Sequence, residues 1–109
     1  MEIKKQVNAE NLTIALVGRL DAVTAPQLEK ELNSSLDGIQ NLVFDFEKLD
    51  YIASAGLRVL LVAQKRMNKQ GSMKIKNVSE EVKEVLDMTG FSDFLHIIDS
   101  NAKKLSLEF

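Results

Sequence analysis

Residues 42–61 read LVFDFEKLDYIASAGLRVLL, and this stretch decides the fold class. Leu42 to Phe46 form a short, nearly continuous apolar run of the kind found in strands that are covered on both faces. From Ser54 onward the apolar residues recur at helical spacing instead, and this helix should end before Gly71. Its apolar face consists of Leu57, Leu60, Leu61 and Met67. The stretch therefore predicts a central strand followed by an amphipathic helix.

The chain before this stretch should contain a β-hairpin and one helix. Residues 12–17 alternate as in a strand with one buried face, and residues 3–7 can precede them across a turn at residues 8–11. Residues 24–27, Thr-Ala-Pro-Gln, have the pattern of a capping box with a proline in the first turn. The residues that follow at helical spacing before Gly38 are Leu28, Leu32 and Leu36.

The chain after this stretch continues the alternation of strands and helices. Residues 73–76 alternate as a fourth strand, and Ser79 can cap a third helix that ends at Gly90. Residues 94–98 read as a fifth strand, and residues 101–107 as a short closing helix. Strands that alternate with helices predict an α/β domain.

Length and composition limit the class of protein. At 109 residues, with 45% hydrophobic and 28% charged residues, the chain can bury one core, so residues 1–109 should form a single domain. No apolar run approaches the roughly 18 residues of a membrane helix, and residues 1–5 lack the apolar segment of a signal peptide. We expect a cytoplasmic protein without a membrane partner. The net charge of -2 and the pI of about 5.4 argue against nucleic acid as a partner.

Motifs for metals and cofactors are missing from the sequence. Cysteine is absent, which excludes disulfides and thiolate metal sites. The sequence has no glycine-rich phosphate loop, histidine-rich metal pattern or dinucleotide fingerprint. Asp45, Glu47 and Asp50 read as strand-end and turn carboxylates rather than as a magnesium site. We expect no metal, no cofactor and no intrinsic catalysis.

Ser54 stands where a strand and loop enter a helix, and this position has two interpretations. Its hydroxyl can cap the helix by accepting a bond from an unpaired backbone N–H group. Capping does not explain Gly56, which costs about 1 kcal/mol in a helix relative to alanine and suggests that another group approaches the backbone there. A phosphate on Ser54 would suit the helix start, with Arg58 four residues on to help hold it. The residues alone favour the plain cap.

The same helix carries a basic stripe opposite its leucines. The stripe consists of Arg58, Lys65, Arg66 and Lys69, with Val59 and Val62 among them. Such stripes are usually solvated faces, but the interspersed valines are also what a docking face needs. In that case a negatively charged partner surface would fit.

Three segments together resemble the STAS family of anti-sigma factor antagonists. They are Gly18-Arg19-Leu20-Asp21 with Thr24, residues 49–57 around Ser54, and Met88-Thr89-Gly90-Phe91. The resemblance spans nearly the whole chain. It implies a mixed sheet of four to five strands with about four helices packed mainly on one face.

The resemblance also implies a function. The unphosphorylated form would bind an anti-sigma factor that is itself an ATP-dependent serine kinase, and a sigma factor would be released. The kinase would phosphorylate Ser54 and so switch binding off, and a serine phosphatase would reverse this. Asp21 would lie close to the serine in the interface, although a loop or helix-capping role is the alternative for it. The candidate partner-binding residues are Asp21, Thr24, Ala53, Ala55, Gly56, Arg58, Val59 and Val62.

Two alternatives remain from the sequence. Many phosphorylated members of the family carry a polar residue, often Asp, where this chain has Ala53, so a STAS-like subunit of a lipid-transport or sensory complex without phospho-switching is the second reading. A serine hydrolase is the remote one, because Ser54, then Asp87 or Asp93, then His96 follow the order of a catalytic triad. Against the hydrolase, Ile52 stands where the nucleophile elbow has its first glycine. A monomer is favoured, and the sequence names neither the sigma factor nor the signal.

Overall fold

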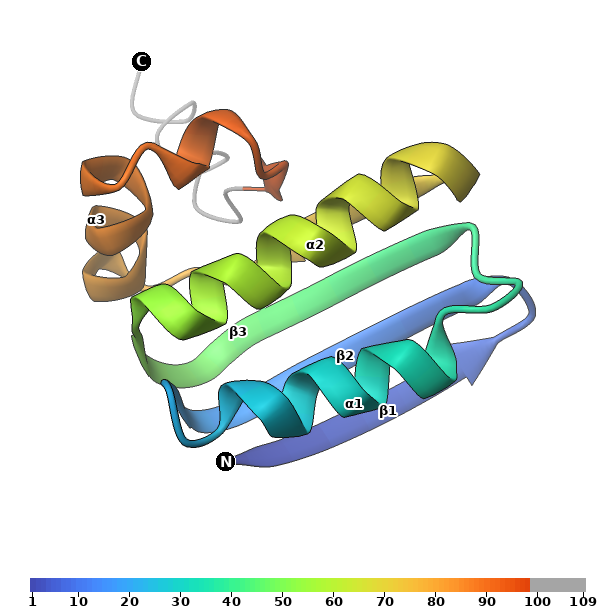
Figure 1. The fold of residues 1–109 in the computed structure, drawn as a ribbon, viewed down its shortest axis with the longest axis horizontal. Coiled ribbons are helices and arrows are strands. Elements are labelled where there is room, and N and C mark those ends of the chain that lie inside the picture. The colour runs from blue at the N-terminus through green and yellow to red at the C-terminus, as the bar shows by residue number, and fades with distance from the viewer. Residues whose placement is uncertain (99–109) are drawn as a thin grey trace, which may run out of the picture.

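The scaffold is a mixed five-stranded sheet in the part of the chain that the computed structural model describes, residues 1–98 (Figure 1). The strands follow one another across the sheet in chain order. The first two are antiparallel, and every later neighbour pairs in parallel. They are β1 (Glu2–Asn8), β2 (Asn11–Leu20), β3 (Asn41–Ile52), β4 (Ser72–Lys76) and β5 (Ile97–Ile98). The predicted hairpin and the central place of the third strand are confirmed.

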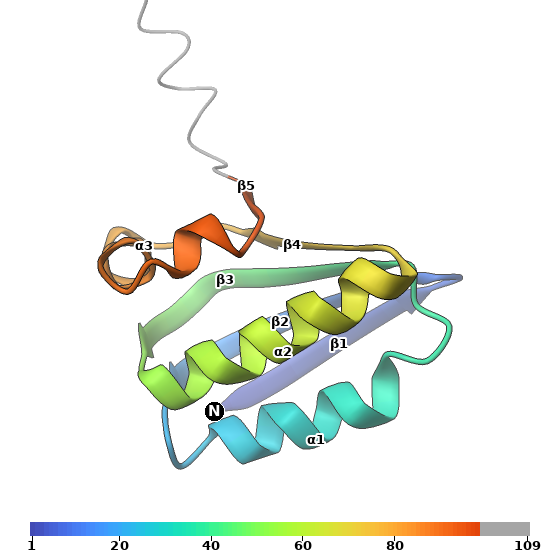
Figure 2. The same cartoon turned by 45° about the horizontal axis from the view of Figure 1, so that its top comes forward.

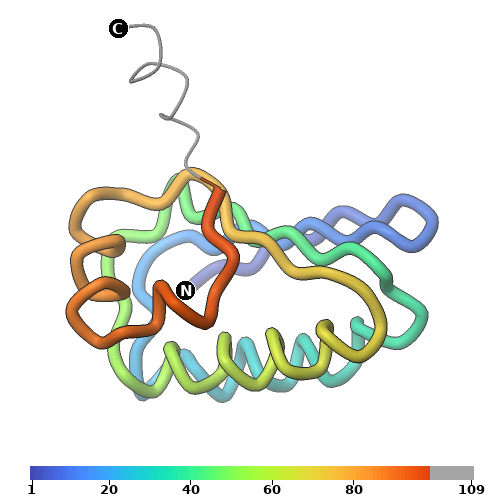
Figure 3. The backbone as a smooth tube through the Cα atoms, turned by 90° about the horizontal axis from the view of Figure 1, so that it is seen from above, coloured from blue at the N-terminus to red at the C-terminus, as the bar shows by residue number. Residues whose placement is uncertain are grey.

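Within the described residues, three α-helices and one 3₁₀ turn accompany the sheet, against about four helices expected. They are α1 (Ala25–Ser35), α2 (Ser54–Gln70), α3 (Glu80–Met88) and the 3₁₀ turn η1 (Phe91–Asp93). α1 and α2 lie side by side on one face of the sheet (Figures 1 and 3). α3 packs against β3 at one end of the molecule. No helix in residues 1–98 is long and apolar enough to cross a membrane.

The core lies between the sheet and the two helices α1 and α2. On β3 the side chains of Leu42, Phe44 and Phe46 are buried, whereas those of Val43 and Asp45 are only half-buried. The prediction that this strand is covered on both faces is therefore wrong, because both long helices lie on the same face. The helix residues that complete this core include Leu28, Leu32, Leu57 and Leu60.

The fifth strand is shorter than the predicted range 94–98. The chain after α3 forms η1 instead, and the backbone N–H groups of Phe94 and Leu95 both donate to the carbonyl oxygen of Phe91 at 3.0 Å. Phe94 and Leu95, which were predicted to belong to the strand, take part in this turn instead, so β5 covers only two residues. The predicted helix at residues 101–107 lies outside the described residues.

Both ends of α3 lie where the sequence predicts them. Ser79 caps its start by accepting a hydrogen bond from the N–H group of Val82 at 3.2 Å. Gly90, with φ of 79°, takes the left-handed conformation just after the helix. The cap and the terminating glycine are confirmed.

Because β2 and β3 are parallel, the connections that follow these two strands leave the sheet at the same end of the strands. Leu20 at the end of β2 pairs with Ile52 at the end of β3. The N–H group of Ala53 then donates to the carbonyl oxygen of Leu20 at 2.9 Å. The turn that begins at Asp21 and the start of α2 at Ser54 therefore follow neighbouring strand ends (Figure 2).

Candidate functional site

Ser54 is the first residue of α2 and does not cap it. Ala53 holds the cap position with an extended backbone (φ -116°, ψ 173°), and no side chain caps this helix. The carbonyl oxygen of Ala53 accepts the first helical bond from the N–H group of Leu57 at 3.1 Å. The predicted capping role of Ser54 is therefore wrong, and its side chain is exposed.

The reason is the sheet pairing just before the helix. Because Ala53 still bonds to Leu20 across the strand ends, it is the last extended residue, and the helix begins directly after it. Ser54 thus falls one position after the cap position, from which a side-chain oxygen accepts a hydrogen bond from an N–H group two or three residues further on. The hydroxyl is presented to solvent at a helix start, between the Asp21 turn and α2.

Gly56 is explained by internal packing. It is buried, and a Cβ atom added there would lie 2.5 Å from Cγ of Leu20 and 3.2 Å from its carbonyl oxygen. The expectation that another group approaches this backbone is confirmed, and the group is the end of β2. The close approach seats the first turn of α2 on the strand and so fixes where Ser54 points.

Asp21 organises the turn between β2 and α1. Its Oδ1 accepts hydrogen bonds from the N–H groups of Val23 at 3.0 Å and Thr24 at 3.1 Å. Oδ2 lies 3.6 Å from Nε of Arg19. The bond from the Thr24 N–H group, with smaller contributions from Val23, the Thr24 hydroxyl and Arg19, holds the pKa of the Asp21 carboxyl below its usual value. The loop-capping interpretation of Asp21 is confirmed, and its contact with a partner stays a prediction.

Thr24 serves the same turn and not the helix that follows. Its hydroxyl donates to the carbonyl oxygen of Arg19 at 2.8 Å and accepts from the N–H group of Asp21 at 2.9 Å. No side chain caps α1, so the predicted capping box is wrong. Both hydrogen bonds of the hydroxyl therefore go to the backbone before Thr24.

Replacing Thr24 with valine, which keeps the shape of the side chain, should therefore lower the free energy of unfolding by about 1–2 kcal/mol. The loss arises because the N–H group of Asp21 and the carbonyl oxygen of Arg19 each lose a partner. Urea denaturation measures it. Thr13→Val in β2 is the matched control, because Thr13 makes no side-chain hydrogen bond within residues 1–98. Equal stability of both variants would contradict this role for Thr24.

A shallow groove of about 360 Å³ lies between the starts of α1 and α2, and Ala55, which follows Ser54 in the chain, is among its lining residues. Val62 is 61% exposed, whereas Val59 is only 8% exposed. Val62 is therefore available to a partner, and Val59 is mainly part of the packing between the helices. The lining residues are Ala22, Ala25, Pro26, Glu29, Ala55, Arg58, Val59 and Val62.

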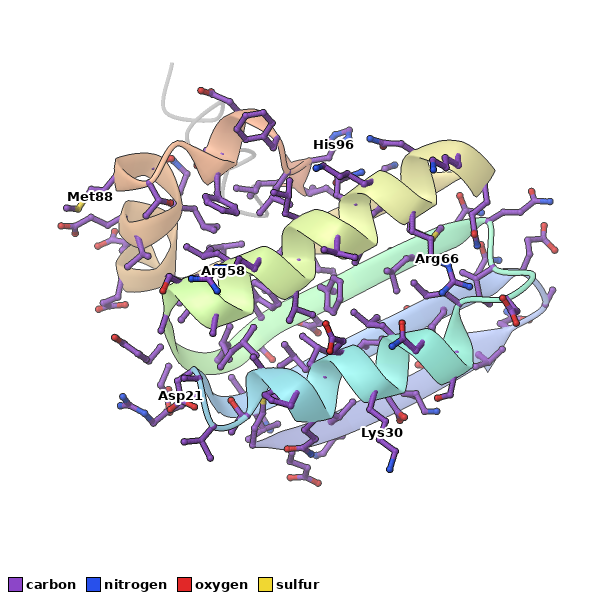
Figure 4. The ribbon with its side chains drawn as sticks, in the orientation of Figure 1. Asp21, Lys30, Arg58, Arg66, Met88 and His96 are labelled. Carbon is purple, nitrogen blue, oxygen red and sulfur yellow. The ribbon has the colours of Figure 1, made fainter. Side chains whose placement is uncertain are left out.

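The basic stripe on α2 is narrower than the sequence indicated. Nη2 of Arg66 pairs with Oδ1 of Asp37 at 2.7 Å, which ties it to the loop after α1. Arg58, Lys65 and Lys69 are exposed and lie on one line along the helix with Val62. Figure 4 shows Asp21 and Arg58 at the same end of the molecule, with Arg66 toward the other end of α2.

The candidate residues of a hydrolase do not gather around Ser54. Asp87, Asp93 and His96 line a different groove beside the second half of α2, and Ser54 is not among its lining residues. His96 is exposed rather than packed in a strand. Within residues 1–98 there is also no group of three or more His, Asp or Glu side chains that could hold a metal ion.

Two features of the site were missed by the sequence analysis. Ala22, Pro26 and Glu29 contribute the α1 wall of the groove. In addition, the guanidinium carbon of Arg19 lies 4.3 Å from the ring centroid of Tyr51, so a cation–π pair joins the ends of β2 and β3. The one signal that could have identified these residues is their position in the chain, because all of them lie near the same end of the strands as Ser54.

Comparisons with known proteins agree with this arrangement. A family model described as the STAS domain matches residues 2–103. BtrV of Bordetella bronchiseptica, whose name describes a candidate anti-sigma factor antagonist, is 36% identical over 91 residues, or 82% of this chain and 78% of that protein. The anti-sigma-B factor antagonist of Bacillus subtilis is 32% identical over 97 residues, or 88% and 86% of the two chains.

A solved structure of the anti-sigma factor antagonist SpoIIAA in its unphosphorylated form superposes with a TM-score of 0.79. It covers 95% of this chain and 92% of that one at 19% identity, which supports the fold alone. The match of the family model over residues 2–103, together with the two relatives, is decisive: the chain belongs to the STAS domain family.

Proposed function

We propose that this protein is an anti-sigma factor antagonist whose unphosphorylated form binds an anti-sigma factor and thereby releases a sigma factor. The names of its two relatives support the general function. We further propose that the anti-sigma factor is a serine kinase, that it phosphorylates Ser54, and that the phosphate ends binding. A serine phosphatase would restore the active form.

The observation that carries the proposal is the free, exposed hydroxyl of Ser54 at the start of α2. Because Ala53 takes the cap position, no hydrogen bond within residues 1–98 engages the hydroxyl, and a kinase could reach it without unfolding the helix. Ala53 and Ala55 are the small neighbours of Ser54 in the chain, and Val62, exposed about two helical turns further along α2, offers an apolar contact.

The neighbouring charges suit a switch. Asp21 at the adjacent strand end is held ionised by its turn, and Arg58 stands exposed one helical turn beyond Ser54. A phosphate adds about 1.5 to 2 negative charges, so it would repel the Asp21 carboxylate and add charge and bulk to the contact surface. The same addition would therefore disturb any partner that docks on the groove beside Ser54.

Incubation with the cognate anti-sigma factor kinase and ATP should attach one phosphate, which mass spectrometry of tryptic peptides locates on Ser54. Ser54→Ala should gain none, because the acceptor hydroxyl is absent. Ser34→Ala is the matched control, since Ser34 is an exposed serine on α1, away from the start of α2.

Two results would contradict the switch. In one, the wild-type protein gains no phosphate from a kinase that is shown to be active. In the other, Ser54→Ala is modified to the same extent as the wild type. The first result would favour the second interpretation, a STAS subunit of a transport or sensory complex without phospho-switching, and the second result would place the phosphorylated residue elsewhere in the chain.

A further inference from the structure

Three exposed apolar side chains lie at the end of the molecule that carries Ser54. Val23, in the turn organised by Asp21, is 86% exposed, and Met88, at the end of α3, is 78% exposed. Tyr51, near the end of β3, is 42% exposed. Figure 4 shows Met88 on the outer side of α3, at the same end of the molecule as Asp21. Apolar side chains that stay exposed near one another are typical of surfaces that bind another protein.

Met88 and Tyr51 line a groove between the end of β3 and α3, which we call the α3 groove. Its volume is about 300 Å³. The buried residues Ile52 and Val82 form an apolar floor. Because α3 packs against β3, both walls belong to the packed scaffold. The α3 groove is therefore preformed, and it can accept an apolar side chain or the hydrocarbon stem of a longer one.

The rim of the α3 groove is negatively charged. The residues that line it include Asp50, Glu81 and Glu84 but no lysine or arginine. All three carboxylates are exposed, and none forms an ion pair within residues 1–98. Lys83, the neighbouring base on α3, pairs with Asp87 instead. The complementary group is a positive charge on an apolar stem, which describes an arginine or lysine side chain.

A series of contacts joins the α3 groove to the Asp21 turn. Nε of Arg19 lies 3.6 Å from Oδ2 of Asp21, and the guanidinium carbon of Arg19 lies 4.3 Å from the ring centroid of Tyr51. Tyr51 in turn borders the α3 groove together with Met88. The turn after β2, the end of β3 and α3 therefore form one continuous surface.

Ser54 stands in the chain between residues that line two different grooves. Ile52 lines the α3 groove, whereas Ala55 lines the groove between α1 and α2. The charges on the two sides also differ, because carboxylates border the α3 groove and the exposed bases Arg58 and Lys65 follow Ser54 along α2. A protein that covers Ser54 contacts both sides, and the difference in charge favours one orientation of that protein.

We propose that the α3 groove is the second half of the interface with the anti-sigma factor, and that it receives an arginine or lysine side chain of that protein. The hydrocarbon stem of this side chain packs against Met88 and Tyr51, and its charged group pairs with Glu81 and Glu84. This second contact rests on the proposed function, because it presupposes the same partner.

Charge reversal on α3 tests the contact. Glu84→Lys should weaken binding of the purified anti-sigma factor by about tenfold, because repulsion replaces attraction, and the difference should shrink at high salt. Tm should stay close to that of the wild type, since Glu84 is exposed and unpaired within residues 1–98. Glu10→Lys makes the same change in the exposed turn between β1 and β2, at the opposite strand end from Ser54. It is the matched control and should bind as the wild type does.

Removal of the apolar contact is a second, independent test. Met88→Ser should weaken binding by about fivefold without a change in Tm, because the side chain is exposed in the free protein and becomes buried only in the complex. Isothermal titration calorimetry measures all of these affinities. If Glu10→Lys loses as much affinity as Glu84→Lys, the attraction is a general effect of net charge, and the contact is refuted.

Photo-crosslinking identifies the occupant of the α3 groove. With p-benzoylphenylalanine in place of Met88, irradiation of the mixture should link this protein to the anti-sigma factor, and mass spectrometry should locate the link close to an arginine or lysine. The same label in place of Glu10 should form no link. A link between two copies of this chain, or no link to an anti-sigma factor that binds, would overturn the assignment.

Ser54→Asp, titrated alongside, separates this contact from the proposed function. If Ser54→Asp loses affinity while Glu84→Lys and Met88→Ser bind as the wild type does, the α3 groove lies outside the interface and the proposed function stands. If the wild type does not bind the anti-sigma factor at all, both are refuted. If Glu84→Lys and Met88→Ser lose affinity while Ser54→Asp does not, the groove contact is supported and the switch at Ser54 fails.

Discussion

Replacing Gly71 with alanine should lower the free energy of unfolding by about 3 kcal/mol, which corresponds to a fall in Tm of about 15 °C. A Cβ atom at this position would lie only 1.8 Å from the carbonyl oxygen of Gln40. That oxygen cannot simply move, because it accepts the hydrogen bond of the Ser72 N–H group at 2.8 Å where β4 begins to pair with β3. Either the strand pairing or the end of α2 must shift, and both are tied to the core. Thermal and urea denaturation measure the loss.

Gly38→Ala is the matched control for this substitution. Gly38 has a positive φ of 79°, and no atom lies within 4 Å of the position of an added Cβ. Its replacement should therefore cost only the strain of the left-handed conformation, about 1 kcal/mol. If Gly71→Ala unfolds no more easily than Gly38→Ala, the close approach between Gly71 and Gln40 is not a constraint on the fold.

Replacing Ser54 with aspartate should weaken anti-sigma factor binding by about 100-fold. The substitution places a fixed negative charge at the proposed contact, beside the ionised carboxylate of Asp21, and a docking partner would have to bury both charges. Binding of the purified partners by isothermal titration calorimetry measures the change. Tm should stay close to that of the wild type, because the side chain of residue 54 is exposed and acidic groups are favourable in the first turn of a helix.

Two companion variants locate the effect. Ser34→Asp adds the same charge to an exposed position on α1, and it should bind as the wild type does. Ser54→Ala, which removes the hydroxyl without adding charge, should retain most of the affinity. Unchanged binding by Ser54→Asp would refute the interface model, even if Ser54 is a genuine kinase substrate.

The strands and helices could be predicted largely from local pattern. The leucines at helical spacing after Ser54 predicted α2, and Gly90 predicted the end of α3. Both predictions succeeded because hydrophobic periodicity and the conformational freedom of glycine are properties of a short segment.

The length of the fifth strand was predicted wrongly, because it depends on backbone hydrogen bonds rather than on the pattern of a short segment. Residues 94–98 are apolar enough to form a strand. However, the N–H groups of Phe94 and Leu95 bond to the carbonyl oxygen of Phe91 in a turn, and the side-chain pattern does not predict these backbone bonds.

The site was predicted less well, because its geometry depends on pairing between distant segments. Ser54 was expected to cap α2, but the bond between Ala53 and Leu20 across the strand ends moves the cap one residue earlier. Gly56 was correctly read as a point of close approach, yet only the fold identifies Leu20 as the neighbour.

The position of β1 at the edge of the sheet has a consequence for solubility at high concentration. Its outer backbone groups face away from β2, and such an edge is a template on which the strands of other chains can add and aggregate. Lys4 and Lys5 are adjacent, so their side chains leave the strand on opposite faces. Lys5 reaches Glu31 of α1 at 3.0 Å. An incoming strand would have to desolvate an ammonium group on either face, so β1 resists fibre formation while it completes the sheet.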